Sequence, residues 1–144
     1  MRNTIDWIDF SLTDRLIPRL LETPELALYL SFRDRDLDHI PQSLSQLPFL
    51  KHLDLSENRR IFSHDQRGID QYPLDVLEGS LMCLEHLYLS ENDLSSIRDW
   101  IFHLPSLNTL VINDNRLNRL WRGSPTCFNL KILNISNNQL THLP

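Results

Sequence analysis

The sequence predicts an α/β solenoid, in which short repeats stack and each repeat adds one strand to a single parallel sheet. The prediction depends on a recurring phrase with leucine at its first and fourth positions, leucine or isoleucine at its sixth and asparagine at its ninth. The asparagines of four copies are Asn58, Asn92, Asn115 and Asn138, spaced 34, 23 and 23 residues apart. A period of between about 20 and 29 residues is typical of stacked repeats and outranks any local assignment of helix or strand.

The first half of each repeat predicts a short strand. Leu87 and Leu89 alternate with His86 and Tyr88, so in an extended chain the leucines lie on one side and the polar residues on the other. The leucine side must be buried, which requires equivalent strands to pair in parallel. We expect strands near residues 28–32, 51–55, 85–89, 108–112 and 131–135. The predicted core residues are Leu30, Phe32, Leu53, Leu55, Leu87, Leu89, Leu110, Ile112, Leu133 and Ile135.

The second half of each repeat is more variable but keeps apolar residues three or four positions apart. In the third repeat these are Ile97, Ile101, Leu104 and Leu107. Such spacings indicate one or two helical turns, which we expect on the convex side of the stack. Prolines such as Pro41 keep these turns short, because proline interrupts a helix.

The asparagines have a physical role at the end of each strand. The chain turns there over the edge of the sheet, where backbone groups lose water and need hydrogen-bond partners. A side-chain amide offers two donors and an acceptor. One asparagine can therefore satisfy backbone groups of its own turn and of the neighbouring turn.

With this frame, residues 27–144 resemble the leucine-rich-repeat family, with 23-residue repeats and no cysteine-rich caps. The resemblance implies a right-handed superhelix with a parallel β-sheet on the concave face and short helical or irregular convex segments. It also implies that the asparagines form a stacked ladder. Arg35 occupies the ladder position of the first repeat, and a guanidinium cannot accept a hydrogen bond. We therefore expect the first repeat to turn differently, with the Arg35 side chain in solvent.

Three segments depart from the repeat. Residues 1–26 fit an N-terminal cap or a degenerate repeat, and either should cover the open end of the first repeat. The longer spacing between the first two asparagines places an insertion near 61–73, which is either a tolerated surface loop or part of a binding face. The fifth repeat is incomplete at Pro144, which favours either a longer solenoid or self-association through an open strand edge.

Composition narrows the classes of function. The net charge of −5 disfavours nucleic acid as a partner, and with only 3 glycines there is no glycine-rich loop for phosphates. No apolar run is long enough to predict a membrane span, and the start does not have the order of a secretory signal. The two cysteines make no disulfide framework. We expect no cofactor. We expect the protein to lie in the cytoplasm, or to be a secreted effector that acts in a host cytoplasm.

Binding residues of a solenoid are expected among the variable strand positions, which line the concave face. These positions form rows across the strands, with about 4.8 Å between neighbouring strands. They place one central patch at Tyr29, His52, Asp54, His86 and Tyr88, with Val111 beside it. Aromatic residues among polar ones are enriched in protein interfaces. The alternative is an ordinary exposed sheet surface. Two histidines without an obvious further ligand do not predict a metal site.

A second row stands immediately before the ladder asparagines. It consists of Asp34, Glu57, Glu91 and Asp114. Acids at one position of successive repeats favour a partner with a basic surface. Alternatively the row is simply solvated, and Arg59 and Arg116 neutralise part of it.

The sequence therefore predicts a non-catalytic protein interaction module that binds a basic, partly apolar protein surface on its concave face. The patch and the acidic row are its candidate partner-binding residues, and no catalytic or metal-binding residue is predicted. The alternative is the substrate-recognition segment of a larger enzyme, such as a bacterial secreted effector or a ubiquitin ligase. Neither a nucleic acid nor a membrane is an expected partner.

Overall fold

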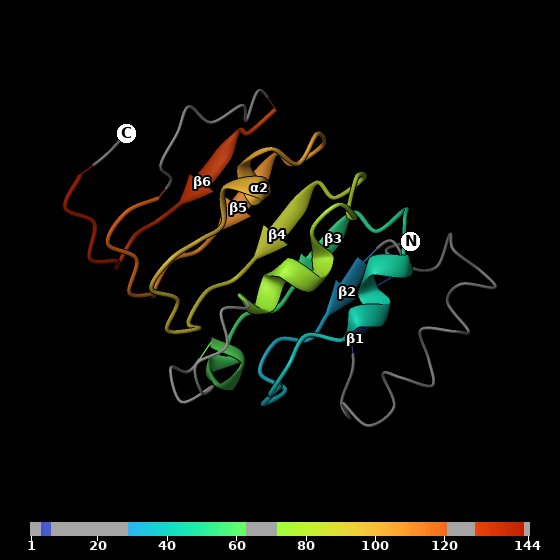
Figure 1. Cartoon of the computed structure of the whole chain (residues 1–144), viewed down its shortest axis with the longest axis horizontal. Helices are drawn as coiled ribbons and strands as arrows, with labels where there is room; N and C mark the ends of the chain where they lie inside the picture. The colour runs from blue at the N-terminus through green and yellow to red at the C-terminus, as the bar shows by residue number, and fades with distance from the viewer. Residues whose placement is uncertain (1–3, 7–28, 63–71, 121–128, 143–144) are drawn as a thin grey trace.

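The computed structural model describes residues 4–6, 29–62, 72–120 and 129–142. Within these ranges six strands form one parallel sheet whose order follows the sequence (Figure 1). The strands are β1 (Thr4–Asp6), β2 (Tyr29–Ser31), β3 (His52–Asp54), β4 (His86–Tyr88), β5 (Thr109–Val111) and β6 (Ile132–Asn134). The last five lie inside the five predicted ranges. The predicted α/β solenoid is confirmed.

The register keeps equivalent residues of successive repeats side by side. Tyr29 lies opposite His52, His52 opposite His86, and Thr109 opposite Ile132. The longer step between the second and third repeats leaves this register intact, because the additional residues lie outside the strands. Rows of equivalent side chains therefore run straight across the sheet.

β1 adds one strand before the five repeats. It pairs in parallel with β2, and Thr4 lies opposite Tyr29. The following residues, 7–28, lie outside the described residues, so the division of the chain at residue 26 stays a prediction.

Short helical turns cover one face of the sheet (Figure 1). They are η3 (Gln42–Gln46), η5 (Pro73–Leu77) and α2 (Asp99–Phe102). Each contributes apolar side chains to the core, among them Leu44, Leu74 and Ile101. The predicted convex turns are thus present, and none exceeds five residues. The corresponding segment of the fourth repeat, 121–128, lies outside the described residues.

The core lies between the sheet and these turns. Leu30, Leu53, Leu87 and Leu110 occupy equivalent strand positions and are at most 1% exposed. Leu133, their counterpart in β6, is only half-buried because no further described repeat packs against it. The predicted core residues all face inward, and Leu133 and Ile135 of the fifth repeat are incompletely covered.

The asparagine ladder is confirmed, and Asn58 shows its pattern. Its Oδ1 accepts the N–H groups of Arg35 at 3.2 Å and Leu37 at 3.1 Å. Its Nδ2 donates to the carbonyls of Phe32, Leu55 and Ser56 at 2.8 to 3.0 Å. Asn115 repeats these contacts, accepting the N–H groups of Asn92 and Leu94. Asn58 and Asn115 therefore tie the turn of the preceding repeat to the end of their own strand.

The first repeat does not turn differently, which corrects the expectation for Arg35. The backbone N–H of Arg35 donates to Asn58, so this turn is held by the asparagine of the next repeat and needs none of its own. The preceding residue, Asp34, has φ 53°, close to the 59° of Glu57 and the 56° of Glu91. The Arg35 side chain is half-buried, and its Nε is buried with no hydrogen-bond partner among the described residues. It is therefore not simply in solvent.

The first residues of the predicted insertion pack into the core. Ile61 and Phe62 belong to a turn, η4 (Arg59–Phe62), and are buried in the core rather than extruded. Figure 1 places η4 at the edge of the sheet where the strands end. Residues 63–71 lie outside the described residues, so the bounds of the insertion stay a prediction.

Tyr72 fixes the chain where the repeat resumes. Its hydroxyl donates to the carbonyl of Ser96 at 2.7 Å, and the Arg98 guanidinium lies 4.9 Å from its ring centroid. Arg98 Nε also pairs with Asp75 at 3.3 Å. Burial raises the pKa of the Tyr72 phenol above its ordinary value, and this outweighs the opposing effect of Arg98. The return from the insertion is thus anchored to the next repeat.

Candidate interaction surface on the concave face

The strands present a mixed aromatic and polar surface on the face away from η3, η5 and α2, which we call the concave face. Because side chains alternate along a strand, burial of the central leucines turns their neighbours outward. Tyr29, His52, His86 and Tyr88, which we call the aromatic cluster, are all half-buried on this face. Asp54 and Val111 are half-buried beside them. The structure therefore brings the whole predicted patch together.

The aromatic cluster packs ring against ring across three strands. The His52 and Tyr88 rings stack with centroids 4.9 Å apart and planes inclined by 27°. The His52 ring also lies 5.7 Å from Tyr29 and 5.8 Å from His86, in tilted arrangements. Such packing restricts the rotamers of the rings before any partner arrives. The cluster is therefore a preorganised contact surface.

Charged groups border the aromatic cluster. Asp54 Oδ1 accepts the N–H of Ser56 at 2.9 Å. Glu85 lies 3.7 Å from Lys51 Nζ and 3.9 Å from His86 Nε2. The Lys51 charge is thus compensated within the chain, while Asp54 has no basic side chain among its contacts in the described ranges.

The concave face has no aromatic residue in β5 or β6 and includes two aliphatic side chains there. Thr109 is buried, Val111 is half-buried and Ile132 is 56% exposed. Ile132 stands in the same row as His86 and Thr109. The surface therefore combines an aromatic region over β2 to β4 with a mixed region over β5 and β6, where the aliphatic Val111 and Ile132 lie beside the exposed, polar Asn134.

The acidic row follows a backbone constraint. Asp34, Glu57, Glu91 and Asp114 all have φ between 53° and 59°, in the left-handed region. This conformation lets each backbone N–H donate to a carbonyl of the next repeat, as Asp34 does to Ser56 at 3.0 Å. Aspartate and asparagine tolerate such φ values better than most residues. The aspartates therefore have a structural explanation, whereas the two glutamates do not.

Part of the acidic row is engaged within the chain. Glu57 pairs with Arg33, and Asp114 accepts hydrogen bonds from Asn113 and from Asn137. The predicted neutralisation by Arg116 is wrong, because its guanidinium pairs with Asp93, outside the row, at 3.4 Å. The row is thus less available as a charged surface than the sequence predicts.

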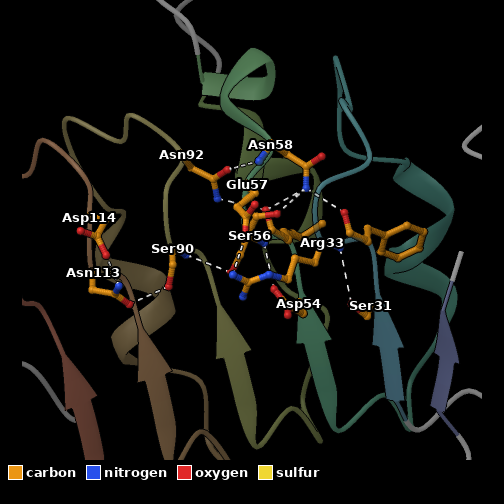
Figure 2. A network of polar contacts seen from close by, with 12 residues as sticks. Ser31, Arg33, Asp54, Ser56, Glu57, Asn58, Ser90, Asn92, Asn113 and Asp114 are labelled. Carbon is orange, nitrogen blue, oxygen red and sulfur yellow. Dashed lines mark hydrogen bonds and ion pairs between the residues drawn. The ribbon is translucent and has the colours of Figure 1, made fainter. Parts of the chain in front are cut away.

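A second polar ladder was not anticipated from the sequence. Ser56 and Ser90, buried at equivalent positions after β3 and β4, connect neighbouring repeats (Figure 2). Ser90 N–H donates to Ser56 Oγ at 3.1 Å, and Ser90 Oγ donates to Asn113 Oδ1 at 2.7 Å. The sequence could have indicated this ladder, because serine recurs two positions before the ladder asparagine. This ladder holds the strand ends that display the aromatic cluster.

The surface offers ring faces, carboxylates and aliphatic side chains. In the described ranges no three His, Cys, Asp or Glu side chains are grouped to hold a metal ion. The same ranges include no helix that could span a bilayer. Flat rings, a carboxylate and aliphatic groups on a rigid sheet are suited to contact with a protein surface.

Comparison with family models matches the leucine-rich-repeat model to residues 83–104 and 129–144. Among curated proteins, the chain is 32% identical over 125 residues to Toll-like receptor 7 of Mus musculus, across 81% of this chain and 12% of the receptor. It is 39% identical over 100 residues to Toll-like receptor 5 of Homo sapiens, across 69% of this chain and 11% of the receptor.

A third relative is an enzyme subunit. The chain is 34% identical over 99 residues to geranylgeranyl transferase type-2 subunit alpha of Pongo abelii, across 67% of this chain and 15% of the subunit. The chain thus spans 15% or less of each of these three relatives.

A solved structure shows the same fold. A leucine-rich-repeat protein of Leptospira interrogans superposes with a TM-score of 0.57 at 21% identity, over 97% of this chain and 37% of that chain. At this identity the likeness concerns the fold alone. The repeat phrase, the asparagine ladder, the parallel register and these matches agree, and the chain belongs to the leucine-rich-repeat family.

Proposed function

We propose that this chain is a non-catalytic module that binds a protein with a basic, partly apolar surface on its concave face. The observation that carries the proposal is the aromatic cluster, in which four half-buried rings from three neighbouring strands pack against one another. Leucine-rich-repeat proteins generally mediate protein interactions, which supports the general class. The concave face and the character of the partner are our inference.

The two parts of the surface have different expected roles. Tyr and His side chains with restricted rotamers provide contact area at low entropic cost, so they should determine how long a complex lasts. Glu91 and the other members of the acidic row should mainly accelerate association with a basic partner. The Arg33 pair at Glu57 and the Asn137 contact at Asp114 reduce that contribution.

The chain's own repeats supply conservative substitutions for a test. Thr109 and Val111 occupy in β5 the positions that His86 and Tyr88 occupy in β4. A His86→Thr/Tyr88→Val variant, which we call the concave variant, should therefore keep the sheet while removing two rings. Glu78→Gln changes an exposed residue after η5 and provides a control on the convex side.

The experiment is a quantitative pull-down from one lysate with wild-type protein, the concave variant and the Glu78→Gln control. We expect a set of proteins to be recovered equally by wild type and control, and about tenfold less by the concave variant, since central aromatic residues dominate interface energies. Equal recovery by all three would contradict the proposal. The remaining candidates would then be the insertion between Phe62 and Tyr72 and the exposed edge of β6.

A second candidate is the recognition segment of a larger enzyme. It is favoured by one observation, the 34% identity to an enzyme subunit of which the chain covers 15%. Cloning the natural reading frame with its stop codon distinguishes the two candidates. A catalytic domain fused to these repeats would support the second, and the concave variant would then lower the activity on protein substrates while leaving that on a small substrate unchanged.

A further inference from the structure

Asp54 carries a charge that the fold does not require. Its visible structural role is to accept the N–H of Ser56 through Oδ1. In β6 the equivalent residue is Asn134, and its amide oxygen accepts the N–H of Ser136 at 3.1 Å in the same way. A neutral amide therefore supports the same turn. In β5 the position is held by Val111, so the sheet also accepts an apolar residue there.

This carboxylate lies beside the stacked rings. Asp54 is the register partner of Tyr88 on the neighbouring strand, and it is two residues from His52 on the same face of β3. The Tyr88 and His52 rings stack 4.9 Å apart. Flat ring faces and a carboxylate are thus held side by side. All three side chains are half-buried, which reduces screening by solvent.

Within the described ranges, two cations at the ends of β2 and β3 pair with carboxylates other than Asp54. Lys51 pairs with Glu85, which also faces His86. Arg33 pairs with Glu57 at the end of the strands. The cations of the neighbouring strand ends are therefore already engaged with other carboxylates.

We infer that Asp54, His52 and Tyr88 form a seat for one arginine side chain of the partner protein, an inference that rests on the proposed concave-face function. A guanidinium is planar, stacks on aromatic rings and donates paired hydrogen bonds to a carboxylate. The seat offers the ring faces and the carboxylate to the same guanidinium. A lysine ammonium is compact and strongly hydrated, so it uses the carboxylate but gains less from the rings.

The inference is tested with peptides as defined probes. A phage library of random twelve-residue peptides is selected on the full 144-residue chain, and the enriched peptides are synthesised. We expect them to share one arginine near an aliphatic residue, because Val111 and Ile132 continue the concave face. Replacing that arginine by lysine should weaken binding about fivefold, and replacing it by glutamine about tenfold or more.

Asp54→Asn is the matching change in the protein, because the amide keeps the contact with Ser56. It should weaken binding of the arginine peptide about tenfold and alter binding of the glutamine peptide less than twofold. This non-additivity, measured by calorimetry in a double-mutant cycle, identifies a direct contact. Glu78→Gln, which removes the same charge elsewhere, should change neither affinity. Circular dichroism and Tm of each variant verify folding.

The outcomes separate the two proposals. The arginine seat is refuted, and concave-face binding stands, if the concave variant no longer binds the peptides but Asp54→Asn binds them as wild type does. The same conclusion follows if the concave variant no longer binds the peptides and the arginine and lysine peptides bind wild type equally. If the concave variant also binds as wild type does, both proposals fail. A selection that enriches no arginine-containing peptides likewise counts against the seat.

Discussion

Replacing Asn58 by alanine tests the ladder most directly. The residue is 1% exposed, and its amide serves backbone groups of Arg35, Leu37, Phe32, Leu55 and Ser56. Two of these groups retain another partner in the variant. The Leu55 carbonyl also accepts from Asn92, and the Ser56 carbonyl also accepts the N–H of Asp34. The N–H groups of Arg35 and Leu37 and the carbonyl of Phe32 would lose their side-chain partner.

The expected loss follows from these three groups. A buried backbone group without a partner costs about 1 to 3 kcal/mol. The bond from Arg35 is only partly buried, and water can enter the polar space left by the amide, so the costs should not add fully. We expect Asn58→Ala to lower the free energy of unfolding by about 3 kcal/mol. For a chain of this size that corresponds to a Tm lower by roughly 6 to 12 °C.

Asn138→Ala is the matched control. Its Nδ2 donates to three equivalent carbonyls, those of Ile112, Ile135 and Ser136, but the residue is half-buried. Water can replace the lost amide there, so we expect a loss of about 1 kcal/mol or less. Urea titrations followed by circular dichroism and tryptophan fluorescence measure both variants, with m-values compared. Equal losses would refute the reasoning that burial of the ladder determines its contribution.

Further predictions concern strain, packing and ionisation. Glu91→Asn should raise the free energy of unfolding by about 0.5 to 1 kcal/mol, because asparagine tolerates φ 56° and Asn137 already occupies the equivalent position. A lower free energy of unfolding in a urea titration would contradict this. Leu110→Ala should lower the free energy of unfolding by about 2 to 5 kcal/mol, and Leu133→Ala by about half as much, because the Leu133 side chain is only half-buried. Equal Tm shifts for the two variants would show that β6 is covered in solution. Tyr72→Phe should cost about 1 kcal/mol at neutral pH. Because burial raises the folded-state pKa of Tyr72, its contribution is complete below about pH 10 and declines above it, where the unfolded chain ionises. The variant should therefore lose less stability than wild type above pH 10, and identical alkaline unfolding curves would refute this.

The strands and the core were predictable because the same pattern of leucine and polar residues recurs in each repeat. A single alternation of leucine and polar residues is weak evidence for a strand. Five copies in one frame identify which side of Leu53, Leu87 and Leu110 must be buried. The candidate patch followed from the same frame, since positions beside the leucines must share the opposite face.

The polar contacts were less predictable. Nothing in the repeat phrase states that Ser56 and Ser90 bond across repeats, or that Arg116 pairs with Asp93 rather than Asp114. The length of an arginine side chain allows it to reach several acids of neighbouring turns. Which acid it contacts depends on the turn geometry, and the left-handed residues of each turn determine that geometry.

The sequence by itself determined the repeat period, the parallel register and the residues that share a face, because these depend only on spacing along the chain. The tertiary structure decided how each turn is held and which rings touch. The turn at Arg35 illustrates the difference, since its hydrogen-bond acceptor is Asn58 in the following repeat. The stack of His52 on Tyr88 likewise joins two strands. Both contacts arise because stacking brings residues that are distant in sequence within hydrogen-bond or van der Waals distance.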